Sequence, residues 1–448
     1  MSNTVQDVRE VTLAEILDAR EKRCELQMEL LNKYGATLIS FTMNIAGPIK
    51  NTPLIDRAFR YGYAALLKRL PSDKILHKIS FSDPCGCSAF ISVDLSAKAV
   101  KEICMQIEES CALGRFFDMD VLDQCGKKLE RDQQRSCIIC GKPGRACAAG
   151  RLHPVEDLIA ITTRSMTAHF AKIDAENIGN IAVECLVREV ETTPKPGLVD
   201  LRNNGSHTDM DVNTFRKSAH ALRPYFIECI SIGMLGKQLA PAEVFASLRA
   251  AGLDAERDMY EATGGVNTHK GLIYSMGVLL GAIGLLWTAD KPIAARNAMV
   301  NKAAALVIES TISDFNAADG KTAGEQLYLK YGLRGIRGEV ASGFSSVLSY
   351  SLPIYEEALA KGASPNDAGI RALLSLISSI DDTNLYHRGG REGAIFAKKY
   401  AEKMINCAHD ISMIERMDDE FIERGLSPGG AADLLAITYF LHSIMDIK

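Results

Sequence analysis

The sequence predicts two domains: a mixed α/β domain over residues 1–172 and an all-α helical bundle over residues 173–448. Three observations lead to this prediction. A chain of 448 residues is long enough for two or more domains. Before about residue 170, β-branched and aromatic segments alternate with helical ones. After it, strand patterns become rare, and Gly or Pro separates runs rich in Ala, Leu, Met and Glu.

The elements of the first domain follow in order. Apolar residues at helical spacing predict a helix over 12–34. Strands are predicted over 36–45, 88–96 and 114–122, with a helix over 97–111 before the last of them. A small sheet with helices therefore forms this domain.

The second domain consists of helical runs. Seven are predicted, over 177–191, 212–236, 241–263, 294–315, 366–380, 391–412 and 431–445. The run 271–287 is apolar enough to suggest a membrane span. It is shorter than the usual length of about 20 residues, stands alone and contains four glycines. A buried central helix is the better interpretation.

Composition and charge narrow the choice of partners and compartment. Hydrophobic residues make up 47% and charged residues 24%, as in an ordinary globular protein. The net charge of −5 gives no electrostatic reason to expect nucleic acid or an anionic membrane as a partner. The start of the chain has no secretory pattern, and twelve cysteines are then more typical of thiols or metal ligands than of disulfides. We expect a cytoplasmic protein, and a homo-oligomer stays open.

Two aspartates in the first domain suggest a metal site. Asp118 and Asp120 are two residues apart on a predicted strand, so their side chains share one face. Paired carboxylates suit Mg²⁺, which fills its other positions with phosphates and water, and metal-held phosphates are what a nucleotidyl-type transfer needs. Because D-x-D is common, a solvated strand face is the alternative.

A cysteine-rich segment follows. Cys137, Cys140, Cys147 and His153 have the ligand types and the C-x₂-C start of a zinc site. The next two spacings do not match a common zinc finger, so packed thiols are the alternative. Four arginines of this segment could hold phosphates or form solvated surface charge: Arg131, Arg135, Arg145 and Arg151.

The stretches "TLISFTMNIAGPIK", "LGRFFDMDVL" and "RSCIICGKPGRACAAGRLH" resemble the holo-citrate lyase synthases over approximately residues 10 to 170. The resemblance implies a nucleotidyltransferase-like enzyme that transfers the phosphoribosyl-dephospho-CoA group to a serine of the citrate lyase acyl carrier (γ) subunit, with release of pyrophosphate. Asp118 and Asp120 would be catalytic and hold Mg²⁺. The substrate contacts would be Asn44, Lys50 and Arg115. Where this family carries a histidine before the Gly-Arg pair, the chain has "EESCALGR", with Ser110 and Cys111.

Polar residues of the second domain gather in five short turns between apolar helices. Their sequences are "ETTPKPGLVDLRNNGSHTDMD", "TGGVNTHKG", "YGLRGIRGEVASGF", "DDTNLYHRGGREG" and "SPGGAADLL". Any one of them could be a helix cap or a plain turn. Five turns that combine glycine with acids and bases indicate helix ends that converge on one pocket for a highly phosphorylated substrate. The chain has no P-loop motif.

In this order the five turns resemble the triphosphoribosyl-dephospho-CoA synthases, over approximately residues 178 to 440. The resemblance implies a reaction of ATP with 3′-dephospho-CoA: the ribose C1 of ATP moves to a ribose hydroxyl, adenine leaves and the triphosphate is kept. Candidate bases are Asp200 and Asp209, and His207 or His269 would act as the acid or position the substrate. Asp381 and Asp382 would hold Mg²⁺. The substrate contacts would be Lys195, Lys270, Arg334, Arg337, Asn384 and Arg388.

Together the two resemblances predict a bifunctional enzyme that matures citrate lyase, with Mg²⁺ as cofactor and Zn²⁺ as a second candidate metal. One alternative is a carrier-binding protein in which only the synthase half is active. Another is maturation of the malonate decarboxylase carrier, and a third is a metal-dependent nucleotide hydrolase.

Overall fold

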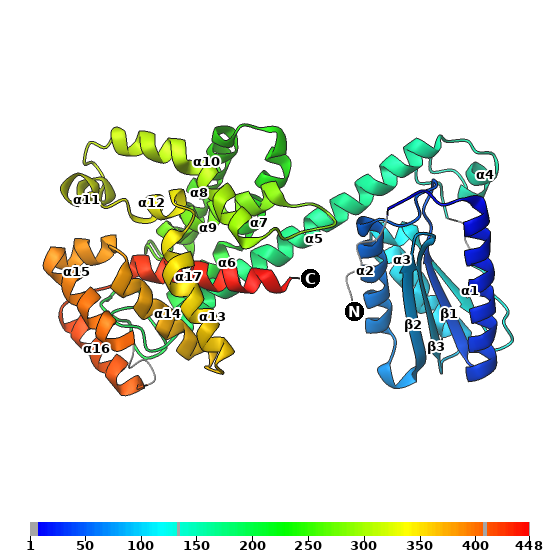
Figure 1. The fold of residues 1–448 in the computed structure, drawn as a ribbon, viewed down its shortest axis with the longest axis horizontal. Coiled ribbons are helices and arrows are strands. Elements are labelled where there is room, and N and C mark those ends of the chain that lie inside the picture. The colour runs from blue at the N-terminus through cyan, green and yellow to red at the C-terminus, as the bar shows by residue number, and fades with distance from the viewer. Residues whose placement is uncertain (1–7, 132–134, 406–409, 448) are drawn as a thin grey trace. The chain divides into compact units, whose positions relative to one another are not determined.

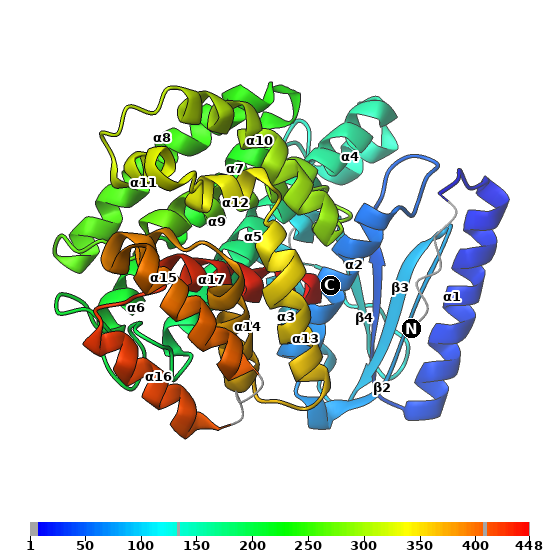
Figure 2. The same cartoon turned by 60° about the vertical axis from the view of Figure 1, so that its left-hand side comes forward.

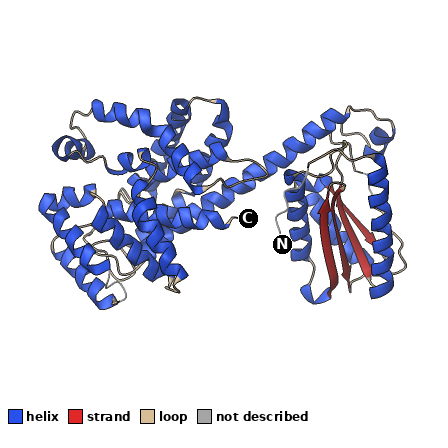
Figure 3. Cartoon of the chain, in the orientation of Figure 1, coloured by secondary structure: helices blue, strands red, loops and turns tan. Residues whose placement is uncertain are grey.

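The computed structural model describes residues 8–131, 135–405 and 410–447. The chain divides into two compact units, Met1–Lys172 and Ile173–Lys448 (Figure 1). The division falls inside the long helix α5 (Val155–Glu191). All described strands belong to the first unit, and the second unit is helical (Figure 3).

The first unit contains one antiparallel sheet with the strand order β2-β3-β1-β4. Its strands are β1 (Thr37–Met43), β2 (Ile75–Asp83), β3 (Gly86–Val93) and β4 (Phe117–Leu122). Its helices are α1 (Leu13–Tyr34), α2 (Pro53–Arg69), α3 (Ala97–Ser110) and α4 (Gly144–Ala149). The predicted mixed α/β character is therefore confirmed.

The helices lie on both faces of the sheet, with α2 and α3 on one side and α1 on the other (Figure 1). On β4, Phe117, Met119 and Val121 are buried, while the residues between them face the other side. Gly62 lets α2 approach closely, because a Cβ at that position would lie 2.8 Å from the Phe117 ring. A capping box between Thr12 and Glu15 starts α1.

Three elements of this unit have no counterpart among the sequence predictions, namely helices α2 and α4 and strand β2. Helix α2 begins with Thr52 as its N-cap and Pro53 in its first turn, both ordinary start signals. Strand β2 lies at the sheet edge with only β3 as a partner and is largely exposed. Its mixture of charged and apolar residues lacks the alternation that marks a half-buried strand.

The second unit confirms the all-α prediction. Beyond α5 its helices are α6 (Val212–Ala221), α7 (Arg223–Leu235), α8 (Pro241–Thr263), α9 (Lys270–Leu286), α10 (Arg296–Asn316), α11 (Ala323–Tyr331), α12 (Gly335–Ala341), α13 (Leu352–Ala360), α14 (Pro365–Ser379), α15 (Thr383–Ile405), α16 (Ile411–Glu423) and α17 (Gly429–Ser443). Helices α13, α14 and α17 pack against one another (Figure 2).

Several predicted helix bounds were wrong. The run 212–236 is two helices, because α6 ends before Leu222 and α7 starts with a proline in its first turn. Helix α15 starts at Thr383, earlier than predicted, and it is interrupted at Gly390, where φ is 62°. Part of the predicted run 391–412 lies outside the described residues, and α16 was not predicted.

The apolar run 271–287 forms α9, the buried central helix of the unit. Its glycines explain how other elements approach it. A Cβ at Gly281 or Gly284 would overlap the side chain of α8 or the backbone of α7, so those helices pack directly against it. No helix in the described part of the chain combines the length and the apolar character that crossing a bilayer requires.

Candidate active sites

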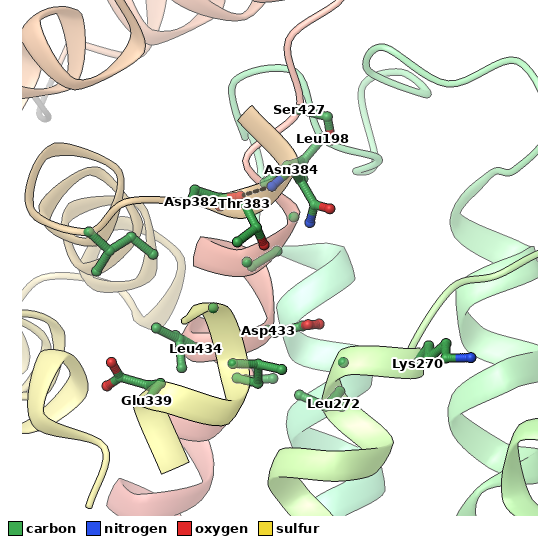
Figure 4. Close-up of a pocket in the computed structure, with 18 of the residues that line it drawn as sticks. Leu198, Lys270, Leu272, Glu339, Asp382, Thr383, Asn384, Ser427, Asp433 and Leu434 are labelled. Carbon is green, nitrogen blue, oxygen red and sulfur yellow. Dashed lines mark hydrogen bonds between the residues drawn. The ribbon is translucent and has the colours of Figure 1, made fainter. Parts of the chain in front are cut away.

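A cavity of about 1000 Å³ in the second unit is lined by residues from all five polar turns. The end of α5, the start of α9, α12, the start of α15 and the start of α17 surround it. Figure 4 shows part of this lining, with Asp382 and Asn384 from α15 and its preceding turn, Glu339 from α12 and Asp433 from α17. The convergence that the spacing of the turns predicts is therefore present.

The first turn is organised around buried charges. Lys195 Nζ lies 2.5 Å from Glu189 Oε1, and both side chains are almost fully buried. Asp200 lies outside the cavity lining. Its carboxylate accepts hydrogen bonds from the backbone N–H groups of Lys195, Arg202 and Asn203. These hydrogen bonds hold the turn, and the role of Asp200 as a base stays a prediction.

His207 is fixed between two partners at the cavity wall. Its Nδ1 lies 3.2 Å from Arg388 Nη2, and its Nε2 lies 3.0 Å from Ser427 Oγ. Since arginine can only donate, Nδ1 accepts and Nε2 donates. Burial and the nearby Arg388 lower the pKa of His207. A neutral His207 that orients Arg388 is the role this geometry favours.

His269 precedes α9 and is also neutral. Burial lowers its pKa to about 3. Thr268 donates to Ser218 Oγ, which lies 2.7 Å from His269 Nδ1. The Ser218 proton then goes to Nδ1, so Nε2 carries the ring proton. That Nε2–H is buried and has no protein partner among the described residues, which leaves it as a donor for a ligand.

Three carboxylates lie close together at the helix ends. Asp382 accepts from the backbone N–H groups of Asn384, Leu385 and Ala431, and thus joins the starts of α15 and α17. Asp433 points toward the start of α9 (Figure 4), where a Cβ at Gly271 would overlap its carboxylate. Burial, Glu189 and Asp382 raise the pKa of Asp433 well above its usual value. These surroundings favour the protonated form of Asp433.

The remaining predicted acids of this site take other positions. Asp209 and Asp381 both line the cavity. One oxygen of Asp381 lies 2.6 Å from Lys398 Nζ. Glu339 accepts from the backbone and hydroxyl groups of Ser346, and burial raises its pKa.

The predicted basic residues differ in whether a carboxylate of the protein already pairs with them. Lys195 is paired with Glu189, Lys270 lies 2.9 Å from Glu256, and Arg337 lies 3.1 Å from Asp314, outside the cavity lining. Arg337 thus forms a surface ion pair, and its role as a substrate contact stays a prediction. In contrast, Arg334 and Arg388 line the cavity and have no carboxylate partner in the described ranges.

The start of helix α9 adds backbone N–H groups to the wall of the same cavity. Its N-cap residue, His269, gives it no side-chain cap, and Asn267 accepts only from Lys270 N, at 3.3 Å. The next N–H groups, of Gly271 and Leu272, have no acceptor within the described residues. Such a helix start attracts an anion. Together with Arg334 and Arg388 it suits a triphosphate.

The first unit carries a second candidate site on β4. Asp118 and Asp120 share the face opposite the buried core residues, next to Thr42 and Ser40 of β1. Lys128 Nζ lies 2.6 Å from Asp120 Oδ2. Desolvation by the surrounding protein and the negative charge of Asp120 raise the pKa of Asp118. The shared face that the spacing predicts is confirmed.

The residues predicted to contact substrate in this unit are largely engaged in hydrogen bonds within the protein. Lys50 Nζ donates to the carbonyl of Ile45 at 2.7 Å, and Arg115 donates to the carbonyl of Ser136. The backbone N–H of Asn44 donates to Phe116, beside the start of β4. Ser110 donates to Ile107 and offers no replacement for an imidazole. The four zinc candidates lie together, with ligand atoms within 4.8 Å of one another.

Sequence reasoning assigned no role to three acids near the two sites, of which Glu108 and Glu189 are buried and Asp433 is partly buried. Glu108 on α3 binds Arg131 and Arg135 at 2.6 and 2.7 Å and accepts from Met119 N. Glu189 lies on the apolar stripe of α5 that includes Ala182 and Leu186, which was a readable signal. Asp433 lay inside a recognised motif, but without its neighbours it had no distinguishing feature.

Comparison with known proteins gives a family for both units. A family model described as ATP:dephospho-CoA triphosphoribosyl transferase matches residues 175–448. A model described as apo-citrate lyase phosphoribosyl-dephospho-CoA transferase matches residues 11–169.

Individual relatives agree with these matches. A protein called CitXG from Haemophilus influenzae is 33% identical over 455 residues, covering 97% of this chain and 96% of that protein. CitXG from Leuconostoc mesenteroides subsp. cremoris is 32% identical over 472 residues, covering 97% of each. The 2-(5''-triphosphoribosyl)-3'-dephosphocoenzyme-A synthase of Klebsiella pneumoniae is 37% identical over 278 residues, covering 60% of this chain and 92% of that protein. The chain therefore belongs to the family of CitXG fusion proteins and is a transferase with a CitX domain followed by a CitG domain.

Proposed function

We propose that the chain carries out two consecutive transfers that build and attach the prosthetic group of citrate lyase. The second unit makes 2'-(5''-triphosphoribosyl)-3'-dephospho-CoA from ATP and 3'-dephospho-CoA. The first unit then transfers the phosphoribosyl-dephospho-CoA group to a serine of the acyl carrier subunit. The observation that carries the proposal is the single cavity in which all five turns of a CitG domain meet.

In the first reaction the acceptor hydroxyl oxygen bonds to the ribose C1 of ATP while the bond from C1 to adenine breaks. Such a displacement passes through an oxocarbenium-like state. Asp209 takes the hydroxyl proton, and Asp433, kept protonated by its surroundings, gives one to the departing adenine. The neutral His269 donates a hydrogen bond through Nε2. Arg334, Arg388 and the start of α9 bind the triphosphate.

The acids at the start of α15 fit Mg²⁺. Asp381 has an oxygen outside its contact with Lys398 and would be the main ligand. Asp382, next to it, is held by backbone N–H groups at the starts of α15 and α17 and would add its negative charge to the site. Mg²⁺ needs only one or two carboxylates when phosphates supply other ligands. When bound there, it would neutralise the triphosphate.

For the second reaction we propose a nucleotidyltransferase-like arrangement. The serine oxygen bonds to the phosphorus next to the ribose, pyrophosphate leaves, and the hydroxyl proton passes to the carboxylate pair on β4. Desolvation first, and the charge of Asp120 second, raise the pKa of Asp118, and a shared Mg²⁺ would relieve the repulsion between the two carboxylates. None of the described cysteines forms a disulfide, which fits the reducing cytoplasm where we place the protein.

Release of adenine tests the synthase half. With ATP, Mg²⁺ and 3'-dephospho-CoA, chromatography should show free adenine and a product that keeps the triphosphate. Adenine should not appear without dephospho-CoA. Formation of ADP regardless of dephospho-CoA would instead indicate a nucleotide hydrolase and reject the proposal.

A further inference from the structure

The segment between β4 and α5 brings four metal-binding side chains together. Cys137 and Cys140 lie in a turn, Cys147 lies on α4, and His153 follows that helix. One ligand atom from each lies within 4.8 Å of the others. The C-x₂-C, C-x₆-C and C-x₅-H spacings, which match no common finger, are thus compatible with one centre.

The turn that carries the first two cysteines has defined backbone geometry. Cys137 N donates to Lys142 O at 2.6 Å, and Gly141 N donates to Cys137 O at 3.0 Å, with Gly141 at a φ of 73°. Ile139 N points at Cys137 Sγ, 3.5 Å away. A backbone N–H directed at sulfur favours the thiolate form, which is the form that binds metals.

The sulfur and nitrogen positions also fit a tetrahedral ion. Cys140 Sγ and Cys147 Sγ are 3.5 Å apart and do not form a disulfide. Tetrahedral zinc with Zn–S bonds of about 2.3 Å separates its sulfurs by about 3.8 Å. His153 Nε2 is buried and has no hydrogen-bond partner in the part of the chain that is described. A buried nitrogen without a partner is costly, and a metal bond would satisfy it.

We propose that Cys137, Cys140, Cys147 and His153 bind one structural Zn²⁺ ion. Four protein ligands leave no position for water or substrate, so the centre is closed rather than catalytic. Zinc is favoured over harder cations because three of the four ligands are thiolates.

The location of this centre suggests its task, and this part of the inference rests on the proposed function. Arg135, two residues before Cys137, donates to Phe117 O at 2.8 Å and lies 2.7 Å from Glu108. Arg115 donates to the carbonyl of Ser136. The residues just before the first ligand thus hold the backbone on the N-terminal side of Asp118. Zinc therefore positions the strand that carries the two aspartates.

Metal content tests the zinc site without any substrate. Elemental analysis and native mass spectrometry of the full chain should find about one zinc per chain. The Cys140→Ser variant should lose it, while Cys24→Ser, an exposed thiol on α1 outside the cluster, should keep it. Cobalt substitution should give the absorption of a tetrahedral cobalt–thiolate centre. A chain without zinc, or equal zinc in Cys140→Ser, would overturn the proposal.

A second experiment treats the unaltered chain with a chelator, so its result does not depend on whether the Cys140→Ser variant folds. Removing zinc should make three further thiols reactive toward an alkylating reagent and lower carrier loading at least tenfold, with adenine release unchanged. Added zinc should restore loading. If zinc is present but its removal leaves loading intact, the positioning role is rejected. If the zinc-loaded chain never loads the carrier, the proposed function fails and the zinc site stands.

Discussion

Asp433 lies where the ionised form of a carboxyl group is unfavourable. Desolvation by the surrounding protein and the nearby carboxyl groups of Glu189 and Asp382 raise its pKa, and it has neither a hydrogen bond nor an ion pair within the described residues. An acid that stays protonated near neutral pH is what a departing base needs. Sequence alone could not single it out, because its pKa shift arises from desolvation in the folded chain and from Glu189 and Asp382, which are distant from it along the chain.

Replacing this acid should stop the first reaction. Asp433→Asn keeps the size of the side chain but cannot give up a proton, so adenine release should fall roughly 100- to 10,000-fold. Chromatographic assay of adenine measures it. Asp290→Asn, an exposed aspartate outside the cavity, is the matched control. Full activity of Asp433→Asn would remove Asp433 from the mechanism.

The same residue predicts a pH dependence of stability. A raised folded-state pKa means that the stability contributed by protonated Asp433 is fully present below its usual value of 3.8 and is lost as pH rises through the folded value. Asp433→Asn does not ionise, so its melting temperature should exceed that of the unaltered chain increasingly from about pH 4 upward. Thermal unfolding in a chelating buffer measures this. A constant difference at every pH would contradict the assigned shift.

At the scale of single elements, Asp382 joins the starts of α15 and α17 through three backbone N–H groups. Asp382→Ala would leave these buried groups without an acceptor and should lower the free energy of unfolding by about 2–5 kcal/mol. Urea denaturation measures it. Asp410→Ala removes an exposed cap from α16 and should lower the free energy of unfolding much less. Equal losses in the two variants would show that Asp382 does not join the helices.

Gly114 allows the chain to turn from α3 into β4. A Cβ there would overlap the backbone carbonyl of Glu108, so Gly114→Ala must displace the start of β4 and with it Asp118. We expect carrier loading to fall at least tenfold while adenine release is unchanged. Gly324→Ala, where nothing lies within 4 Å of the added Cβ, should leave both activities intact. Normal loading by Gly114→Ala would mean that the turn is not needed for the site.

The elements that could be predicted were those with a regular pattern. The alternation on β4 correctly gave the shared face of Asp118 and Asp120, and the glycine-rich run 271–287 correctly gave a buried helix. The edge strand β2 shows no alternation because it is largely exposed. Only the folded chain reveals the backbone partner of Asp200 and the ion-pair partner of Arg337.

At the scale of the whole chain, two transferase units lie on one polypeptide. Two fold classes were visible because the strand patterns end near residue 170. The two reactions should be separable by mutation. Asp118→Asn should release adenine at the normal rate and fail to load the carrier. Asp433→Asn should load the carrier only when the purified triphosphoribosyl intermediate is supplied, as the mass of the carrier would reveal. Loss of both activities in each variant would contradict separate sites.

The mass of the carrier is also the most direct test of the whole account. The chain is incubated with ATP, 3'-dephospho-CoA, Mg²⁺ and the apo acyl carrier subunit of citrate lyase, and the intact carrier is weighed. We expect a gain equal to one phosphoribosyl-dephospho-CoA group on a serine, accompanied by free adenine and pyrophosphate. A carrier of unchanged mass, under conditions in which adenine is released, would contradict the second transfer.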